Sequence, residues 1–135
     1  MAPTRYPSSD VSPAPLAEPL TFPFSGVTAS NRFLKGAMTE RLSSWDPKDF
    51  SKRGIPSENL IRVYERWGEG ECGHILTGNI MMHYDQLEAM GNPIIPLEAK
   101  ATPGDERFEA FKKMAEKGKK HGSLMVGQVS HPGRQ

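Results

Sequence analysis

The chain has 135 residues, and its 17 lysines and arginines against 16 aspartates and glutamates give a formal net charge of +1. A chain of this length forms at most one domain, and its near-neutral charge gives no electrostatic reason to expect nucleic acid or an anionic membrane as a partner. No apolar run approaches the roughly 20 residues that span a bilayer, the N-terminus lacks the apolar core of a signal peptide, and the single Cys72 fits a reducing compartment. We therefore expect a cytoplasmic protein.

Residues 1–20 are rich in proline and serine, and we expect them to form a disordered tail. Such a segment has too little apolar surface to offset the entropy that is lost on folding. The domain is expected to span residues 21–135. It begins with Thr21–Gly26, where aromatic residues and a turn predict a short hairpin, or a cap across the bottom of the domain.

Three apolar runs predict short buried strands, and each run delivers polar groups at its C-terminal end. The runs are Phe33–Met38, residues 74–78 and a stretch from Leu124 to about Val129. The polar groups are Thr39 and Glu40 after the first run, Gly78 and Asn79 at the end of the second, and Gln128 in the third. Because ligands bind at the carboxyl ends of parallel strands, these groups are candidates for a binding site.

Two segments with helical spacing separate the strands. The first begins with Ser57 as its N-cap after Pro56, and the second runs from Asp105 to about Lys120. Their expected buried faces are Leu60, Val63, Tyr64 and Trp67 in the first helix, and Phe108, Phe111, Met114, Ala115 and Gly118 in the second. The long polar connection Arg41–Pro56 is expected to have a functional role, because loops of this length are otherwise uncommon in compact domains.

The order of these elements predicts the fold. Connections that contain a helix join parallel strands, and such crossovers are right-handed. Strand starts near residues 33, 74 and 124 are separated by roughly 40 to 50 residues, the period of a βα unit with enlarged loops. A doubly wound sheet would carry a glycine-rich phosphate loop after its first strand, and this sequence has none. We therefore predict an α/β fold made of the first three βα units of a TIM (β/α)8 barrel, which is incomplete.

Four groups of residues follow one another along the chain. They are Asn31-Arg32 with Ala37-Met38-Thr39, then Gly54 and Pro56 before the helix that contains Tyr64, then Ile75-Leu-Thr-Gly78, and last Gly127-Gln128 with His131-Pro-Gly-Arg134. With these groups the chain resembles the N-terminal portion of the old yellow enzyme family, the FMN-dependent NADH:flavin oxidoreductases. The resemblance covers roughly residues 20–135.

The resemblance implies that FMN lies at the C-terminal mouth of a TIM barrel. Ala37 and Met38 would offer backbone groups beside the flavin, and Thr39 would place its hydroxyl near the flavin C4 carbonyl and N5. Gly78 or Asn79 would contact the isoalloxazine ring, and the Gln128 amide would meet the pyrimidine edge, which presents both donors and acceptors. The implied reaction passes hydride from NAD(P)H through FMN to the β-carbon of a small-molecule substrate with an activated alkene.

Several alternatives remain open at this point. Thr39 is also an ordinary β-branched strand residue, Asn79 stands where the family usually has a smaller residue, and His131 and Arg134 have either a positioning or a catalytic role. No catalytic residue is identified, and no metal spacing of His, Cys or carboxylates is present. An unrelated phosphate-binding TIM barrel fits the periodicity but leaves the four groups unexplained.

The chain stops after three of the eight expected strands, which leaves two readings of its function. It is either the truncated N-terminal part of an FMN-dependent NAD(P)H oxidoreductase or ene-reductase, or a non-catalytic remnant or interaction module that lacks the substrate-binding strands. An open three-stranded sheet leaves two unpaired edges and one uncovered apolar face. Self-association through these edges is therefore an expected behaviour.

Deletion of residues 1–18 tests the disordered tail. Because a disordered segment buries no apolar surface, the truncated protein is expected to keep nearly the same thermal stability. The measurement is the melting temperature of the two proteins under identical conditions. A clear fall in melting temperature would show that the tail is docked on the domain.

Overall fold

The computed structural model describes residues 10–133. The first part of the chain contains α1 (Ala14–Ala17), β1 (Leu20–Thr21), β2 (Thr28–Ala29), β3 (Leu34–Lys35) and the 3₁₀ helix η1 (Phe50–Lys52). The second part contains α2 (Glu58–Glu69), β4 (His74–Met81), α3 (Glu106–Lys119) and β5 (Leu124–Ser130). No helix among the described residues is long and apolar enough to cross a membrane.

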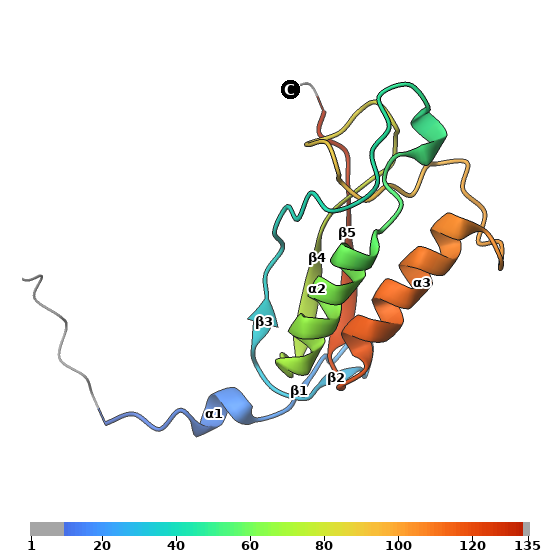
Figure 1. The fold of residues 1–135 in the computed structure, drawn as a ribbon. Coiled ribbons are helices and arrows are strands. Elements are labelled where there is room, and N and C mark those ends of the chain that lie inside the picture. The colour runs from blue at the N-terminus through green and yellow to red at the C-terminus, as the bar shows by residue number, and fades with distance from the viewer. Residues whose placement is uncertain (1–9, 134–135) are drawn as a thin grey trace, which may run out of the picture.

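The main sheet has the order β3-β4-β5, and both pairs of neighbouring strands are parallel. The helices α2 and α3 connect successive strands and lie side by side on one face of the sheet (Figure 1). The α/β fold with parallel strands and helical crossovers is thus confirmed. The described residues include no helix after β5, so the expected number of three βα units stays a prediction.

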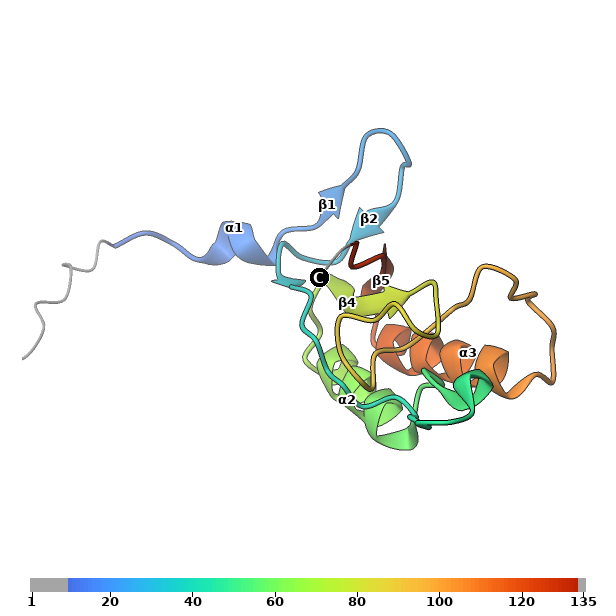
Figure 2. The same cartoon turned by 90° about the horizontal axis from the view of Figure 1, so that it is seen from above.

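The strands β1 and β2 form a separate antiparallel hairpin at the amino ends of the main strands. Viewed from above, this hairpin lies on the opposite side of the sheet from α2 and α3 (Figure 2). The Phe22 ring meets the His74 ring edge-on, with 6.0 Å between the ring centroids. The predicted hairpin is confirmed, and it covers only the lower end of that face.

The predicted tail lies partly outside the described residues. Within residues 10–20, Ala14–Ala17 forms one helical turn without buried side chains, and Leu20 already belongs to β1. The Arg32 N–H donates a hydrogen bond of 2.9 Å to the Leu16 carbonyl, which links this turn to the domain. The proline-rich composition did not indicate this turn.

Both long helices begin at the residues that the sequence indicated. The Ser57 hydroxyl accepts from the Leu60 N–H and donates to the Leu42 carbonyl, so it caps α2 and also holds the preceding loop. The Asp105 carboxylate accepts from the Phe108 N–H at 3.0 Å and caps α3. These caps satisfy backbone donors that have no partner inside the helix.

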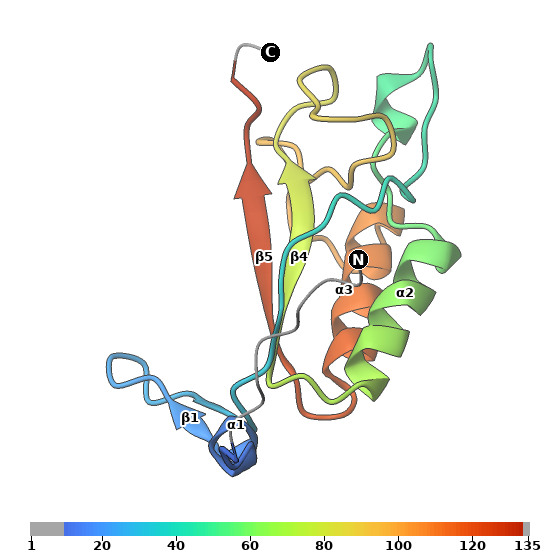
Figure 3. The same cartoon turned by 90° about the vertical axis from the view of Figure 1, so that its left-hand side faces the viewer.

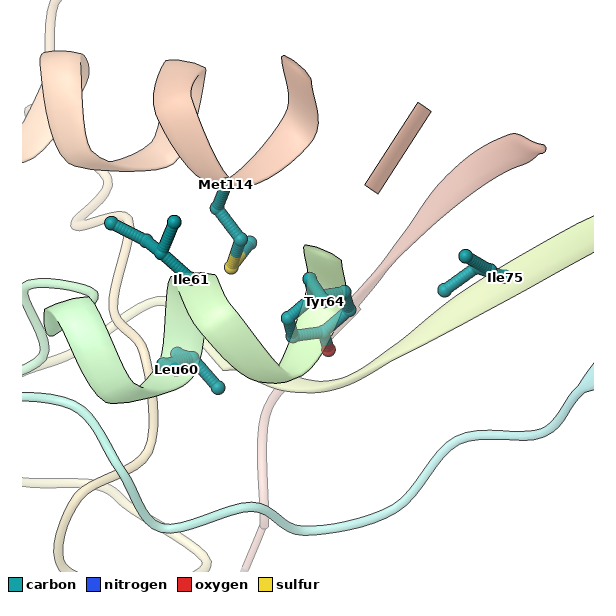
Figure 4. Packing of buried hydrophobic residues seen from close by; sticks show 5 residues of the cluster. All are labelled: Leu60, Ile61, Tyr64, Ile75 and Met114. Atoms are coloured by element: carbon teal, nitrogen blue, oxygen red, sulfur yellow. The ribbon is translucent and has the colours of Figure 1, made fainter. Parts of the chain in front are cut away.

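The core lies between the two helices and β4, and it consists of Leu60, Ile61, Tyr64, Ile75 and Met114 (Figure 4). Three of these residues were expected on the buried faces of α2 and α3. The expected Val63 and Trp67 are only half-buried, whereas Ile61 is buried without having been predicted. Ile61 lies next to Leu60, the first residue of the predicted buried face. It is buried because α2 packs against α3 in addition to the sheet.

The first strand of the sheet is shorter than predicted. The expected strand Phe33–Met38 is wrong beyond Lys35, because the paired part of β3 is only Leu34–Lys35 opposite His74–Ile75. The second strand is longer than expected and continues to Met81, where it bridges Ile94. After Lys35 the backbone does not continue the ladder with β4.

A bulge in β4 lies next to the point where β3 and β4 cease to pair. Leu76 pairs with Val126 and Asn79 pairs with Gln128, so β4 advances by three residues while β5 advances by two. Gly78 belongs to this bulge. A Cβ atom added there would lie 2.1 Å from the Met38 carbonyl oxygen and 2.2 Å from Glu40 Oε2. The segment after β3 therefore passes so close to β4 that only glycine fits at this position.

The face of the sheet opposite the helices is largely open (Figure 3). Leu34, 58% exposed, and Val126, 43% exposed, carry apolar side chains on this face. Ile75 and Lys35 face the helices, and alternate residues of a strand point to opposite sides. The uncovered apolar face expected from the sequence is present in the described part of the chain.

Replacement of Gly78 by alanine tests the close approach of the two segments. We expect Gly78→Ala to lower the free energy of unfolding by about 1–3 kcal/mol, because the added methyl group meets backbone and a buried carboxylate. The matched control is Gly36→Ala, since a Cβ atom at Gly36 meets no atom within 4 Å. Urea denaturation of both variants measures the difference, and equal midpoints would contradict the close approach.

Candidate functional site

Two side-chain amides lie opposite each other where β4 and β5 run parallel. Asn79 and Gln128 are register partners, and Gln128 Nε2 donates to Asn79 Oδ1 at 2.8 Å. The Ser130 hydroxyl donates to the same Asn79 oxygen at 3.0 Å. The structure thus brings together two of the predicted site residues and adds Ser130, which the sequence did not indicate.

The Asn79–Gln128 pair keeps one amide NH₂ group and one amide oxygen free. Asn79 Nδ2 and Gln128 Oε1 have no protein partner among the described residues. If both amides were turned over, the free groups would again be one NH₂ group and one oxygen. These two free groups can bind a ring edge that presents both hydrogen-bond donors and acceptors.

Thr77 of β4 holds the backbone at Gln128, near the end of the third predicted strand. The sequence did not single out Thr77 as part of the site. The buried Thr77 hydroxyl donates to the Gly78 carbonyl at 2.8 Å and accepts from the Gln128 N–H at 2.9 Å. A side chain therefore supplies a hydrogen bond that the bulge removes from the ladder. A threonine beside a glycine inside an apolar run is the sequence signal for such a bulge.

The segment Ala37–Thr39 lies against β4 through its backbone. The Met38 carbonyl faces Gly78, and the side chains of all three residues are exposed, with Met38 at 56%. No hydrogen bond among the described residues joins Thr39 to Asn79 or Gln128. The predicted residues thus form two groups that meet at Gly78, and the Thr39 hydroxyl is free to bind another molecule.

Glu40 does not point toward this site, although it was expected among the polar groups at the strand ends. Its side chain is 3% exposed, and its Oε1 accepts from the Tyr64 hydroxyl at 2.5 Å and from the Gly78 N–H at 3.2 Å. Burial, strengthened by the bond to Glu40, raises the pKa of the Tyr64 hydroxyl far above its usual range, so Tyr64 stays a donor. The Glu40 carboxylate therefore lies between α2 and the sheet.

Lys35 completes this buried polar group. Its Nζ lies 3.9 Å from Glu40 Oε1, donates to the Leu76 carbonyl at 3.3 Å and stands 3.6 Å from the centroid of the Trp67 ring. Burial lowers the pKa of Lys35, and the charge of Glu40 partly offsets this effect. We refer to Lys35, Glu40 and Tyr64 as the Glu40 network. Sequence reasoning missed it because the three residues come from separate elements.

The long loops above the sheet are joined to each other at Arg53. Its buried guanidinium donates to the carbonyls of Asp46, Pro47 and Tyr84, and it stacks between the rings of Trp45 and Phe50 at 4.0 and 3.8 Å. Five N–H donors in one plane suit this multiple bonding. The loop 41–56 is therefore a fixed part of the upper rim (Figures 1 and 2).

His131 lies just beyond β5 and contacts the loop after β4. Its Nδ1 accepts from the Gly133 N–H at 3.0 Å, its Nε2 is hydrogen-bonded to Gln86 Oε1, and its ring meets the His83 ring edge-on at 5.6 Å. Because Nδ1 is an acceptor, the neutral ring carries its proton on Nε2 and donates it to Gln86. Arg134 lies outside the described residues.

A cavity of ≈ 790 Å³ lies away from the predicted site. It lies between the loop around Trp45 and the amino ends of α2 and α3, and none of the six predicted site residues lines it. The predicted residues instead lie on the open face of the sheet and at its upper edge. A ligand held by them would be covered on one side only by this chain.

No family model matches the chain. The NADH-dependent flavin oxidoreductase nadA of Aspergillus parasiticus is 48% identical over 125 residues, which are 93% of this chain and 28% of that protein. The NADH-dependent flavin oxidoreductase iliE of Hypocrea jecorina is 27% identical over 110 residues, or 82% of this chain and 25% of the relative. The chain thus spans only about a quarter of the length of these curated relatives.

Solved structures of old yellow enzymes share the fold of this chain. The old yellow enzyme from Trypanosoma cruzi superposes with a TM-score of 0.68 at 18% identity over 90% of this chain and 28% of that one. Morphinone reductase in complex with tetrahydroNAD gives a TM-score of 0.63 at 18% identity over 88% of this chain and 28% of that one. The resemblance of this chain to a part of the old yellow enzyme family, with NADH-dependent flavin oxidoreductases as its curated relatives, is therefore confirmed.

Proposed function

We propose that this chain supplies part of the FMN site of a flavin oxidoreductase. The observation that carries the proposal is the Asn79–Gln128 pair, which keeps an amide NH₂ group and an amide oxygen free on the open face of the sheet. The pyrimidine edge of a flavin presents both donors and acceptors, so the two sets are complementary. The names of the curated relatives support a flavin and a nicotinamide as the redox pair.

Each predicted residue has a distinct task in this proposal. Gln128 holds the pyrimidine edge, and Asn79 orients the Gln128 amide through their mutual hydrogen bond. Ala37 and Met38 offer backbone groups beside the ring, while Gly78 admits the close approach of the Met38 carbonyl to β4. In this proposal the Thr39 hydroxyl would bond the C4 carbonyl and N5 and so tune the reduction potential.

When bound, FMN accepts a hydride from NAD(P)H and delivers it to the β-carbon of an activated alkene. The residues of this chain bind and orient the ring, and none of them is assigned a proton transfer.

The alternative proposal is a non-catalytic remnant or interaction module. It rests on the open apolar face that carries Leu34 and Val126, which a further chain segment would cover.

Retention of FMN by the purified protein distinguishes these proposals. The protein is mixed with FMN and desalted, and its visible absorbance spectrum is recorded. Retained flavin bands support the FMN site. A colourless protein shows that these residues do not hold FMN without further strands, and it favours the alternative, a non-catalytic remnant or interaction module.

Replacement of Gln128 by leucine tests the amide directly. We expect Gln128→Leu to weaken FMN binding at least about tenfold, because two hydrogen-bonding groups at the pyrimidine edge lose their partner. The control is Asn59→Leu on the exposed face of α2, which is expected to bind FMN as the unchanged protein does. Full flavin occupancy of Gln128→Leu after desalting would contradict the assignment.

Replacement of Thr39 by alanine tests the tuning role of the hydroxyl. In the flavin-loaded protein, Thr39→Ala is expected to shift the flavin reduction potential and to change the rate of reduction by NAD(P)H. Its melting temperature should remain close to the original, because the side chain is exposed. Thr102→Ala, in an exposed loop, serves as the control. Unchanged reduction kinetics in Thr39→Ala would count against the role.

A further inference from the structure

The Gly78 N–H lies at a point of the sheet where β3 no longer pairs with β4. The ladder between β3 and β4 ends at the pair of Lys35 and Ile75, three residues before Gly78. On that side the Gly78 N–H instead donates to Glu40 Oε1 at 3.2 Å and to the Tyr64 hydroxyl at 3.1 Å. Two side-chain oxygens thus stand where a strand would otherwise supply a carbonyl, and they satisfy a buried donor.

The Glu40 carboxylate is held at this point from several sides. Tyr64 donates to it from α2, and Lys35 lies 3.9 Å away with a side chain that is 10% exposed. A buried carboxylate is costly unless it is hydrogen-bonded and paired, and here it is both. The position of the carboxylate is therefore determined by α2 and β3 together. Through its bond with the Gly78 N–H, the carboxylate in turn holds the backbone of β4.

The residue after Gly78 is Asn79, whose side chain holds Gln128. The Gly78 carbonyl accepts from the Thr77 hydroxyl, and the same hydroxyl accepts from the Gln128 N–H. The bulge is consequently bonded to Glu40 on its amide side and to Thr77 on its carbonyl side. Displacement of the Gly78 amide would rotate the Asn79 side chain away from Gln128.

We propose that Glu40 is a positioning residue of the flavin site, because its carboxylate replaces a strand at the Gly78 amide and thereby fixes the Asn79–Gln128 pair. The flavin part of this inference rests on the proposed function. Glu40 itself lies on the helix side of the sheet and touches no reacting atom. The competing explanation is that Glu40 only balances the buried charge of Lys35.

Three variants separate the two explanations. Glu40→Ala removes the carboxylate acceptor of the Gly78 N–H and leaves the Tyr64 hydroxyl, Glu40→Gln keeps an acceptor oxygen but removes the charge, and Lys35→Met combined with Glu40→Ala removes both charges and the carboxylate acceptor. If Glu40 is a positioning residue, Glu40→Gln retains function and the double variant does not. If it only balances Lys35, the double variant retains function and Glu40→Gln does not. Glu69→Ala, which removes an exposed carboxylate paired with Arg66, is the matched control.

The first readout needs no flavin. Hydrogen exchange of backbone amides, followed by NMR, is expected to show at least about tenfold faster exchange of the Gly78 N–H in Glu40→Ala and in the double variant. The Asn79 and Gln128 side-chain amide signals should shift in both. Glu40→Gln and Glu69→Ala should keep the exchange rate within about threefold of the original.

The second readout is the dissociation constant of FMN, from quenching of flavin fluorescence. It should rise at least about tenfold in Glu40→Ala and in the double variant, and stay within about threefold in Glu40→Gln. Equal binding by all variants, or rescue by the double variant alone, overturns the inference. If Glu40→Ala does not fold, Glu40→Gln and the double variant still decide between the explanations.

Failure of the proposed function gives a different result. An unchanged protein that takes up no FMN overturns the flavin site, and with it the flavin part of the inference. The exchange readout still decides whether Glu40 positions the Asn79–Gln128 pair. Unaltered Gly78 exchange and unaltered side-chain amide signals in Glu40→Ala overturn that part as well.

Discussion

The crowding at Gly78 is the constraint on which the arrangement of the sheet depends. At this residue the segment after β3, the helix α2 and the strand β4 come into contact through Met38, Tyr64 and Gly78. The space admits no side chain on β4, and the amide requires an acceptor from outside the ladder. The short β3, the bulge in β4 and the orientation of Glu40 all follow from these two requirements.

The same crowding places the polar groups of the site on one face and the charges on the other. Asn79, Gln128 and Ser130 gather on the side away from the helices, whereas Lys35 and Glu40 are enclosed beside α2. The bulge permits this separation because it changes which residues of β4 face each side. A sheet without the bulge would turn Asn79 toward the helices.

The periodic parts of the fold were predictable from the sequence, and the parts that depend on side-chain bonding were not. Apolar spacing indicated α2, α3, β4 and β5, and residue chemistry indicated the caps Ser57 and Asp105. The run Phe33–Met38 also has the composition of a strand, but Glu40 captures the amide that a longer β3 would have paired. Such a bond between residues 38 positions apart leaves no periodic signal.

The candidate site shows the same division. Resemblance pointed to Gln128 and Asn79, which the structure brings together, whereas Thr77 and Ser130 became visible only from contacts. Glu40 was expected among the polar groups at a strand end, but its bond to the Gly78 amide was not. Thr77 and Ser130 resemble ordinary strand residues when they are considered alone. Their part in the site arises from the three-to-two register between β4 and β5.

The buried Arg53 has a consequence for the recombination of loops between related proteins. It bonds Asp46 and Pro47 in one long loop and Tyr84 in the next, and Gly54 lies directly beneath Ile94 of that second loop. A graft that exchanged only one of these loops would leave a buried cation without its acceptors. The two loops therefore have to be exchanged together. A chimeric protein with a changed upper rim would need both loops from the same source protein.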